Sequence, residues 1–290
     1  MIIVAPRGST VESQLIWLFG IDTQSQKDFL AKSEVDDGKL HFAARYILDE
    51  LGIDAPEPAA NAFEVLIEKF GTSFPKTYEF AKIARDSLTN ISANDDADAV
   101  LVAWLEREEL LFRALERRIV SERLRLGFMS GKEADVDGFI AFSLSVQNRR
   151  KSRAGHSLEH HVEALLKARG LKFERQAVTE GKSRPDFLFP GHTEYHDKQF
   201  DSARLTMLGA KSTLKDRWRQ VLDEADRIKQ KHLLTIEPSI SESQTAAMKT
   251  RNLQLIIPQS LHATYKEVQQ KELMSVSQFI SMIEDRQNKA

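Results

Sequence analysis

Two runs of sequence decide the fold, RPDFLFP at residues 184–190 and RLTMLGAKSTLKDRWRQVLDEAD at residues 204–226. Asp186 stands at the start of one short apolar run, and Lys211 stands at the end of another. Short apolar runs bounded by charged or turn residues are typical of buried strands. The sequence therefore predicts two strands, with an acid entering one of them and a lysine leaving the other.

The period of the apolar side chains changes from strand-like to helical after Lys211. A helix is expected from about Leu214, and Ser212 or Thr213 is its candidate N-cap. The positions that predict this helix are Leu214, Trp218, Val221, Leu222, Ala225 and Ile228. Glu224 would lie on the helix, where it could meet the acid and the lysine at one edge of the sheet.

These side chains fit the chemistry of phosphodiester hydrolysis. Carboxylates that hold Mg²⁺ lower the pKa of an attacking water, and a lysine offsets negative charge in the transition state. Asp186 and Glu224 are the expected metal ligands, and Glu159 is an expected additional carboxylate. Lys211 is expected to position the water and to offset charge.

The composition limits the classes of protein to consider. The chain has 290 residues, of which 41% are hydrophobic, so it can bury a sizeable core. The absence of cysteine excludes disulfides and thiolate metal sites and suits a reducing cytoplasm. No apolar run is long enough to cross a membrane, so we expect a cytoplasmic protein.

A net charge of -2 gives no overall sign of a nucleic-acid partner, so any DNA binding must come from local basic clusters. Two such clusters are present. They are Arg149, Arg150, Lys151 and Arg153, and then Lys211, Lys215, Arg217 and Arg219.

Apolar side chains at three- and four-residue steps predict that residues 10–147 are almost entirely helical. The longest expected helix spans Asp95 to Leu126 and begins at an acidic cluster, which suits a helix N-terminus. Its glutamates and arginines interleave at helical spacing. This pattern fits a solvated face with ion pairs, or a helix that bridges subunits or lies beside a duplex, and the sequence leaves both open.

The basic run QNRRKSRAG at residues 147–155 is expected to separate a helix over residues 136–146 from one that begins near Ser157. Its four cations could clamp a phosphate, or they could form a solvated basic turn. The local sequence makes the two about equally reasonable.

His156, Glu159 and His160 match the inverted zinc-protease pattern H-x-x-E-H. A match of this length is weak evidence without its structural context, and no downstream acid stands out as a third ligand. We therefore expect Glu159 to join the carboxylates of Asp186 and Glu224, with the histidines peripheral.

The C-terminal half predicts further strands, at residues 171–178, 232–237 and 253–258. A helix expected over residues 241–249 makes the last two strands a parallel β-α-β unit. Residues 191–203 are expected to form a polar loop that packs one tyrosine, Tyr195. A helix over residues 276–285 is expected to close the chain.

Lys215, Asp216 and Arg217 lie where the predicted helix begins, with Arg219 close behind them. Cations in the first turn of a helix oppose its macrodipole, so this placement is costly unless an anion or a base edge compensates. Basic side chains donate to guanine O6 and N7, and an acid accepts from cytosine N4. The residues thus predict an element that reads G·C pairs, although two surface ion pairs would also fit.

Four separated blocks of this sequence resemble, in order, the EcoRII and PspGI-like type II restriction endonucleases of the PD-(D/E)XK superfamily. The likeness covers roughly residues 136–285. The blocks are NRRKSRAGHSLEHHVEALL (148–166), TEGKSRPDFLFPG (179–191), YHD (195–197) and RLTMLGAKSTLKDRWRQVLDEADRIKQ (204–230).

The resemblance implies a mixed central sheet flanked by helices. It places a catalytic core at residues 131–290, after a helical region at residues 1–130. It also implies a homodimer that uses Mg²⁺ to cut both strands of double-stranded DNA at a short CCWGG-like or CCNGG-like site.

By position, Asp186, Lys211 and Glu224 correspond to the catalytic residues of that family, and Glu159 corresponds to its additional acid. Residues 215–217 correspond to the element that recognises the outer G·C pairs. Gly209 stands where the simplest nuclease signature has an acid, and the resemblance assigns the role of that acid to the glutamate that follows.

Relatives of this kind flip the central base pair into protein pockets. Tyr195, Lys151 and Arg107 are the candidates for such a pocket here. The family member EcoRII has a strand-rich N-terminal effector domain, whereas residues 1–130 are predicted to be helical. We therefore expect a simple dimer that cuts without a second, activating site.

A DNA methyltransferase is expected in the same system, without a stable complex. Two other functions remain open: a nuclease of the same fold that acts in repair or on branched DNA, and a DNA-binding protein without catalysis. Cleavage of a plasmid into discrete bands would favour the restriction endonuclease.

Overall fold

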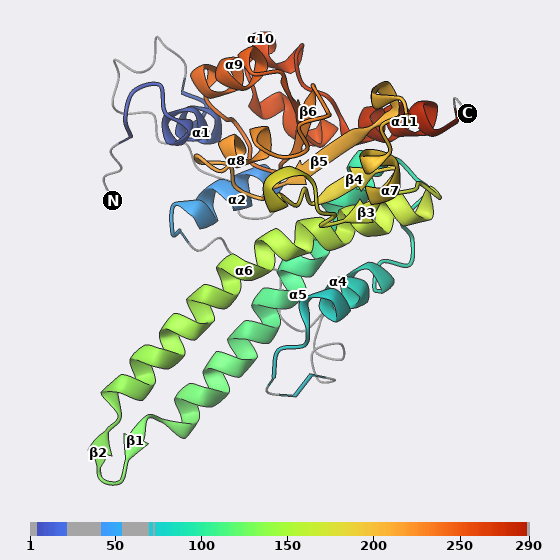
Figure 1. Ribbon diagram of the computed structural model, residues 1–290. Helices are drawn as coiled ribbons and strands as arrows, with labels where there is room; N and C mark the ends of the chain where they lie inside the picture. Colours follow the sequence, from blue (N-terminus) through green and yellow to red (C-terminus); the bar gives the residue numbers. More distant parts are fainter. Residues whose placement is uncertain (1–4, 22–41, 54–69, 72, 289–290) are drawn as a thin grey trace. The chain divides into compact units, whose positions relative to one another are not determined.

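The computed structural model describes residues 5–21, 42–53, 70–71 and 73–288 (Figure 1). The chain forms two compact units. The sheet unit takes residues 1–56, 93–99 and 165–290, and the helical unit takes residues 57–92 and 100–164. Parts of the helical pattern expected in the first 147 residues, at 22–41 and 54–69, lie outside the described residues.

A five-stranded mixed sheet forms the centre of the sheet unit. In spatial order its strands are β3 (Glu174–Arg175), β4 (Phe187–Phe189), β5 (Thr206–Ala210), β6 (Lys231–Leu234) and β7 (Leu253–Ile256). The pairs β3–β4 and β4–β5 are antiparallel, whereas β5–β6 and β6–β7 are parallel. The β-α-β unit predicted from the sequence is present, with α9 (Glu242–Thr250) between β6 and β7.

Helices cover both faces of this sheet, which explains the uninterrupted apolar sequence of its central strands. On one face, Phe279 of α11 (Val276–Asn288) meets Phe189, with ring centroids 5.9 Å apart. On the other face, Val221 of α8 (Trp218–Leu222) packs against Gly209. The closing helix predicted from the sequence is α11.

Two N-terminal helices, α1 (Thr10–Phe19) and α2 (Phe42–Glu50), also belong to the sheet unit. The hydroxyl of Ser9 accepts a hydrogen bond from the backbone N–H of Glu12 and so caps α1. Trp17 and Leu18 of α1 pack against the buried apolar face of α2.

The helical unit contains α4 (Thr77–Asp86) and most of two long helices, α5 (Ala97–Leu126) and α6 (Val136–Ala168). Figure 1 shows α5 and α6 side by side, joined by a hairpin of β1 (Met129–Ser130) and β2 (Glu133–Ala134). The core of this unit contains Phe80, Ala84, Leu111, Phe112, Leu115 and Ile119. The long helix predicted at Asp95 to Leu126 is confirmed, whereas the hairpin was not predicted because its strands are too short to show alternation.

The break predicted at residues 147–155 is wrong, because α6 continues through it as one helix. A single glycine inside a helix costs only about 1 kcal/mol relative to alanine, so Gly155 alone does not end it. The basic run therefore lies along a helix rather than in a turn.

The helix predicted from Leu214 to Ile228 is also wrong in its length, because only α8 forms there. Lys215 (φ 39°) and Ala225 (φ 53°) have left-handed backbones, which an α-helix does not pass through. Ser212 and Thr213 consequently cap no helix. The apolar spacing nevertheless identified buried positions, at Leu214, Trp218, Val221, Ala225 and Ile228.

Two smaller expectations differ from the structure. The strand expected at residues 171–178 is reduced to the two residues of β3. The polar loop expected at residues 191–203 contains a short helix, α7 (His192–His196), which buries Tyr195 as expected. None of the helices in the described part of the chain is long and apolar enough to span a membrane.

Candidate active site

Asp186 and Lys211 meet at one edge of the sheet because β4 and β5 are antiparallel. Asp186 directly precedes β4 and Lys211 directly follows β5. The Nζ atom of Lys211 donates to Oδ2 of Asp186 at 2.7 Å, and the backbone N–H of Ala210 donates to the same oxygen at 2.7 Å. Oδ1 of Asp186 accepts from Nε2 of Gln176 at 3.0 Å. The predicted acid–lysine pair is present, and three donors fix the buried carboxylate in one orientation.

Glu224 lies in the turn after α8 rather than on the helix. Burial first, and then the negative charge of Asp186, raise the pKa of Glu224 to about 7, whereas Lys211 and Lys231 act in the opposite direction. The negative charge of Asp186 thus disfavours ionisation of Glu224. Carboxylates in this relation gain stability from a proton or a cation beside them.

Lys231, the first residue of β6, fixes the backbone that carries Glu224. Its Nζ atom donates to the carbonyl oxygens of Glu224 and Ala225, both at 2.5 Å. Because Ala225 has a left-handed backbone, the chain reverses direction here and needs such a support. Lys231 thus ties the end of α8 to the start of the next strand.

Tyr195, in α7, supports the same segment and is only 1% exposed. Its hydroxyl donates to the carboxylate of Glu180 at 2.6 Å and accepts from the backbone N–H of Arg227 at 3.2 Å. Burial and the bond to Glu180 raise the pKa of Tyr195, so the hydroxyl stays a donor. A ring enclosed in this way has no open face for a flipped base, so the structure gives Tyr195 an anchoring role instead of the expected base-pocket role.

Gly209 explains why this chain departs from the simplest nuclease signature. A Cβ atom at Gly209 would lie 2.9 Å from Cγ2 of Val221 in α8, which is closer than carbon atoms pack. An acidic side chain at this position would therefore displace α8. The second carboxylate comes from Glu224 instead, beyond the end of that helix.

The donor set at this edge fits a divalent cation. Hard divalent cations prefer carboxylate oxygens, and Asp186 and Glu224 offer two carboxylates whose mutual repulsion a cation would relieve. Among the residues that the structure describes, no group of three or more His, Cys, Asp or Glu side chains could hold a metal, and this applies to the zinc motif of α6 as well as to Glu159 together with Asp186 and Glu224. Glu159 belongs to the helical unit, and its part in this site stays a prediction.

Lys215, Asp216 and Arg217 are exposed on a turn before α8, between the buried side chains of Leu214 and Trp218. We call residues 212–217 the recognition turn. These cations precede the helix, so the predicted conflict with its macrodipole is wrong. Their exposure in three consecutive positions, four to six residues after Lys211, nevertheless fits an element that contacts DNA.

The charges predicted to be a phosphate clamp or a solvated face are instead partly paired inside the helical unit. Arg150 and Glu116 form an ion pair at 2.5 Å, and Arg153 pairs with Glu109 and, at 3.6 Å, with Glu108. The side chain of Glu108 is fully buried and that of Glu116 is 4% exposed. Carboxylates of α5 thus pair with both arginines, and the expected contact of these arginines with DNA phosphates stays a prediction. The side chain of Lys151 lies outside the description.

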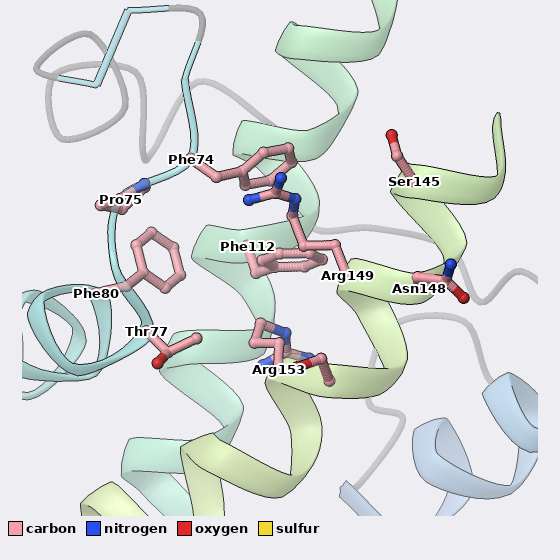
Figure 2. Close-up of a pocket in the computed structure, with 10 residues that line it drawn as sticks. Phe74, Pro75, Thr77, Phe80, Phe112, Ser145, Asn148, Arg149 and Arg153 are labelled. Atoms are coloured by element: carbon pink, nitrogen blue, oxygen red, sulfur yellow. The ribbon is translucent and has the colours of Figure 1, made fainter. Parts of the chain in front are cut away.

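A pocket of about 440 Å³ opens in the helical unit (Figure 2). It is lined by Phe74, Pro75, Thr77, Phe80, Phe112, Ser145, Asn148, Arg149, Ser152 and Arg153. The guanidinium of Arg149 lies 4.4 Å from the ring centroid of Phe74, and that of Arg153 lies 4.5 Å from the centroid of Phe112. Arg107, expected at a base pocket, is not among the lining residues, and its Nε donates to Oγ of Ser87 at 2.7 Å.

Comparison with known protein families matches residues 112–280 to the family described as EcoRII C terminal. The match contains Asp186, Lys211, Glu224 and the recognition turn. The chain belongs to the EcoRII C-terminal family. Membership of a family of restriction endonucleases implies a divalent metal cofactor, which agrees with the two carboxylates at the edge of the sheet.

Two relatives of this chain are type II restriction enzymes. EcoRII of Escherichia coli is 41% identical over 231 residues, which are 79% of this chain and 55% of EcoRII. SsoII of Shigella sonnei is 31% identical over 214 residues, covering 62% of this chain and 68% of SsoII. The chain thus spans about half the length of EcoRII.

Solved structures confirm the fold predicted from the sequence. Metal-depleted Ecl18kI in complex with uncleaved DNA superposes with a TM-score of 0.58 at 20% identity, covering 80% of this chain and 86% of that chain. The PspGI–substrate DNA complex superposes with a TM-score of 0.60 at 16% identity, covering 75% of this chain and 95% of that chain. The fold is the restriction-endonuclease fold, with a mixed sheet flanked by helices.

The sequence did not identify three residues that support the site: Gln176, Lys231 and Glu237, whose carboxylate accepts from the backbone N–H of Leu214 in the recognition turn. Gln176 donates to one carboxylate oxygen of Asp186, and Lys231 donates to the backbone carbonyls of Glu224 and Ala225. These bonds form only in the folded chain, so no residue type or spacing in the sequence indicates them. Glu237 did leave a signal, because it ends the apolar run HLLTIE in the same way that Asp186 borders its own strand.

Proposed function

We propose that this protein is a Mg²⁺-dependent type II restriction endonuclease that acts as a homodimer on a short CCWGG-like or CCNGG-like site in double-stranded DNA. The observation that carries the proposal is the ion pair of Asp186 and Lys211 at one edge of the sheet, and it is supported by the raised pKa of Glu224, on which the charge of Asp186 acts. The exposed recognition turn begins one residue after Lys211. The names of EcoRII and SsoII support the activity.

Each side chain of the site has a defined part in hydrolysis. A divalent cation bound by Asp186 and Glu224 would lower the pKa of an attacking water and offset charge on the scissile phosphate. The donors from Ala210 and Gln176 keep the carboxylate of Asp186 in one orientation. Lys211 presents its ammonium beside that carboxylate, where it can donate to the attacking water and stabilise the phosphorane-like transition state.

Sequence recognition is assigned to Lys215, Asp216 and Arg217. Two donors and one acceptor, all exposed, match the edges of G·C pairs in the major groove. Arg219 is exposed on α8 and is assigned to the phosphate backbone. The structures of Ecl18kI and PspGI are complexes with DNA, which supports double-stranded DNA as the partner of this chain.

We assign the flipped central base to the pocket of the helical unit rather than to Tyr195. Phe74 and Phe112 offer aromatic rings (Figure 2). Asn148 and Ser152 also line the pocket, and their polar groups can bond a base edge. Arg149 already stacks on Phe74, so a planar base could take or extend that stack. Arg107 and Lys151 stay as weaker candidates for the same role.

The homodimer is supported by an exposed apolar surface at one end of α5 and α6. Monomeric soluble proteins rarely expose a large contiguous apolar patch. The exposed apolar residues there are Leu124, Leu126, Met129, Val136, Phe139, Ile140 and Leu144. A dimer would place two active sites on the two strands of one duplex. Analytical ultracentrifugation tests this, and a monomer in the presence of cognate DNA contradicts it.

Digestion of a DNA of known sequence with Mg²⁺, followed by mapping of the ends, tests the activity. The proposal predicts discrete fragments whose ends fall at one short C·G-flanked site, and no cleavage by Asp186→Ala, which should still bind DNA. Nicking that depends on branched structure would indicate a repair nuclease instead. An inert wild type that binds DNA would indicate a protein without catalysis.

The proposed activity places the enzyme in the cytoplasm with a methyltransferase of the same specificity. Host DNA must be protected wherever the nuclease is active. No stable complex between the two proteins is needed, because both act on the DNA site separately.

A further inference from the structure

Three side chains from three different elements hold the backbone of the recognition turn. The hydroxyl of Tyr46, in α2, donates to the carbonyl oxygen of Ser212 at 2.8 Å. The carboxylate of Glu237, after β6, accepts from the backbone N–H of Leu214. The amide of Gln244, in α9, donates to the carbonyl oxygen of Lys215 at 2.8 Å. We call Tyr46, Glu237 and Gln244 the turn clamp.

The clamp is itself supported by the interior of the sheet unit. Glu237 is 7% exposed, and the hydroxyl of Tyr265 donates to its carbonyl oxygen at 2.5 Å. Oε1 of Gln244 accepts from the hydroxyl of Thr10, in α1, at 3.1 Å. Thr10 of α1 and Tyr46 of α2 therefore both support the recognition turn, Thr10 through Gln244 and Tyr46 directly. The turn lies about two hundred positions after Thr10 and over a hundred and sixty after Tyr46.

The recognition turn needs an external hold for two reasons. Lys215 has a left-handed backbone at φ 39°, a conformation that a lysine adopts only when its surroundings impose it. Lys215, Asp216 and Arg217 are also exposed, so their own side chains bury nothing that would fix the turn. The hydrogen bonds of the clamp, together with the buried side chain of Leu214, supply the missing constraint.

We propose that Tyr46, Glu237 and Gln244 are positioning residues that keep the recognition turn in its DNA-binding conformation and thereby set the preference of the enzyme for its own site over other DNA. This inference rests on the proposed function, because it assumes that residues 215–217 read base pairs. A turn that is ordered before binding loses less conformational entropy on the correct sequence. Contacts to phosphates depend less on the conformation of this turn, so binding to random DNA should depend little on the clamp.

The experiment compares binding to two duplexes in metal-free buffer by fluorescence anisotropy. One duplex carries the sequence identified by end mapping, and the other carries the same bases scrambled. The variants are Tyr46→Phe, Gln244→Ala, Glu237→Ala and Glu237→Gln. The quantity measured is the Kd for the scrambled duplex divided by the Kd for the identified sequence, so a lower ratio means a weaker preference for the site. Thermal unfolding is recorded for each variant.

Asp98→Asn is the matched control for a purely structural effect. Asp98 is 3% exposed in the sheet unit, and its carboxylate accepts from the backbone N–H groups of Gln259, Val276 and Ser277, none of which belongs to the recognition turn or to the turn clamp. Its loss should lower the melting temperature. It should leave the ratio of Kd values unchanged.

Tyr46→Phe and Gln244→Ala should each lower the ratio about fivefold, because each removes one hydrogen bond to the turn. Glu237→Ala should lower it further, by about tenfold, since it leaves a buried N–H group unpaired. Glu237→Gln keeps an acceptor oxygen and should restore most of the ratio. In all four variants the affinity for scrambled DNA should stay close to that of the wild type.

An unchanged ratio in both Tyr46→Phe and Gln244→Ala would overturn the inference. Because these two side chains are partly exposed, their variants test the inference even where Glu237→Ala does not fold. An equal loss of ratio in Asp98→Asn would also overturn it, because general destabilisation would then be the cause. A wild type without preference for any sequence would instead overturn the proposed function, before any variant is compared.

Discussion

Glu224 and Glu237 are two glutamates of the sheet unit whose pKa is raised to about 7, and burial is the largest cause in both. They differ in what surrounds them. At Glu224, the negative charge of Asp186 is the second cause that raises the pKa. At Glu237, a hydrogen bond from the backbone N–H of Leu214 acts in the opposite direction and lowers the pKa. One glutamate therefore faces a second acid, and the other faces a donor.

In the proposed mechanism, this difference separates a reactive carboxyl group, that of Glu224, from a structural one, that of Glu237. Glu224 is held by its backbone, through Lys231, so its carboxyl group is left for chemistry. Glu237 uses its carboxyl group to hold the recognition turn. A raised pKa alone does not distinguish these roles, and the neighbouring groups do.

The largest expected effect is on cleavage by Glu224→Gln. If Glu224 binds the metal as proposed, its loss should reduce the rate of DNA cleavage by about a thousandfold or more, and DNA binding should persist. The rate is measured in single-turnover reactions with excess enzyme and saturating Mg²⁺.

Glu237→Gln is the matched control for this change, since it makes the same chemical substitution at the other raised-pKa glutamate. Its single-turnover rate on cognate DNA should remain within about tenfold of the wild type. Similar rates for the two variants would remove the distinction between a reactive and a structural carboxyl.

A pH dependence of stability should follow from Glu237. In the unfolded chain its pKa returns to the ordinary 4.5, and in the folded chain it is about 7. Between these values the folded protein binds more protons than the unfolded chain, so this group lowers stability as the pH rises from about 4.5 to 7. Glu237→Gln, which does not titrate, should gain stability relative to the wild type by up to the order of 3 kcal/mol at pH 8.

Urea unfolding at pH 5 and at pH 8 measures this difference. The gain of Glu237→Gln over the wild type should be small at the lower pH and larger at the higher one. A gain or loss that is the same at both pH values would show that Glu237 is ionised in the folded protein with an ordinary pKa.

Arg217→Ala tests the exposed side of the recognition turn. If Arg217 makes a bidentate contact to guanine, its loss should weaken binding to the cognate duplex by about 1 to 3 kcal/mol and change binding to random DNA much less. Arg251→Ala, which removes an exposed arginine after α9, is the control. Equal losses on both duplexes would make Arg217 a phosphate contact.

The smallest expected effect is the overpacking of Gly209→Ala. The new methyl group would approach Val221, and we expect a loss of stability of about 1 kcal/mol. Val221→Ala should make room for it, so the two substitutions together should cost less than the sum of their separate effects. Additive costs in urea unfolding would show that the contact with α8 does not exclude an acid at this position.

The sequence predicted the sheet and its edge because their signals are local. The apolar runs of β4 and β5 marked buried strands, and the positions of Asp186 and Lys211 at their ends followed from the strand boundaries. The buried positions after Lys211 were also correct. Their helical spacing did not show that Lys215 and Ala225 adopt left-handed backbones, because that depends on contacts made by distant residues.

The same limit explains the errors in the helical unit. The sequence did not show which acids lie beside Arg150 and Arg153. Only the packing of α5 on α6 shows that glutamates of α5 pair with them. The turn clamp was invisible for the same reason, since Tyr46 and Gln244 act on backbone oxygens. Tertiary hydrogen bonds to backbone atoms leave no mark on residue type or spacing.

Titration of Mn²⁺ into the protein, followed by electron paramagnetic resonance, tests the central claim most directly. Mn²⁺ takes the same oxygen ligands as Mg²⁺ and can be counted as free or bound. The account predicts a saturable site in the wild type that is strongly weakened in both Asp186→Asn and Glu224→Gln and retained in Glu237→Gln. Wild-type Mn²⁺ binding in both Asp186→Asn and Glu224→Gln would contradict it.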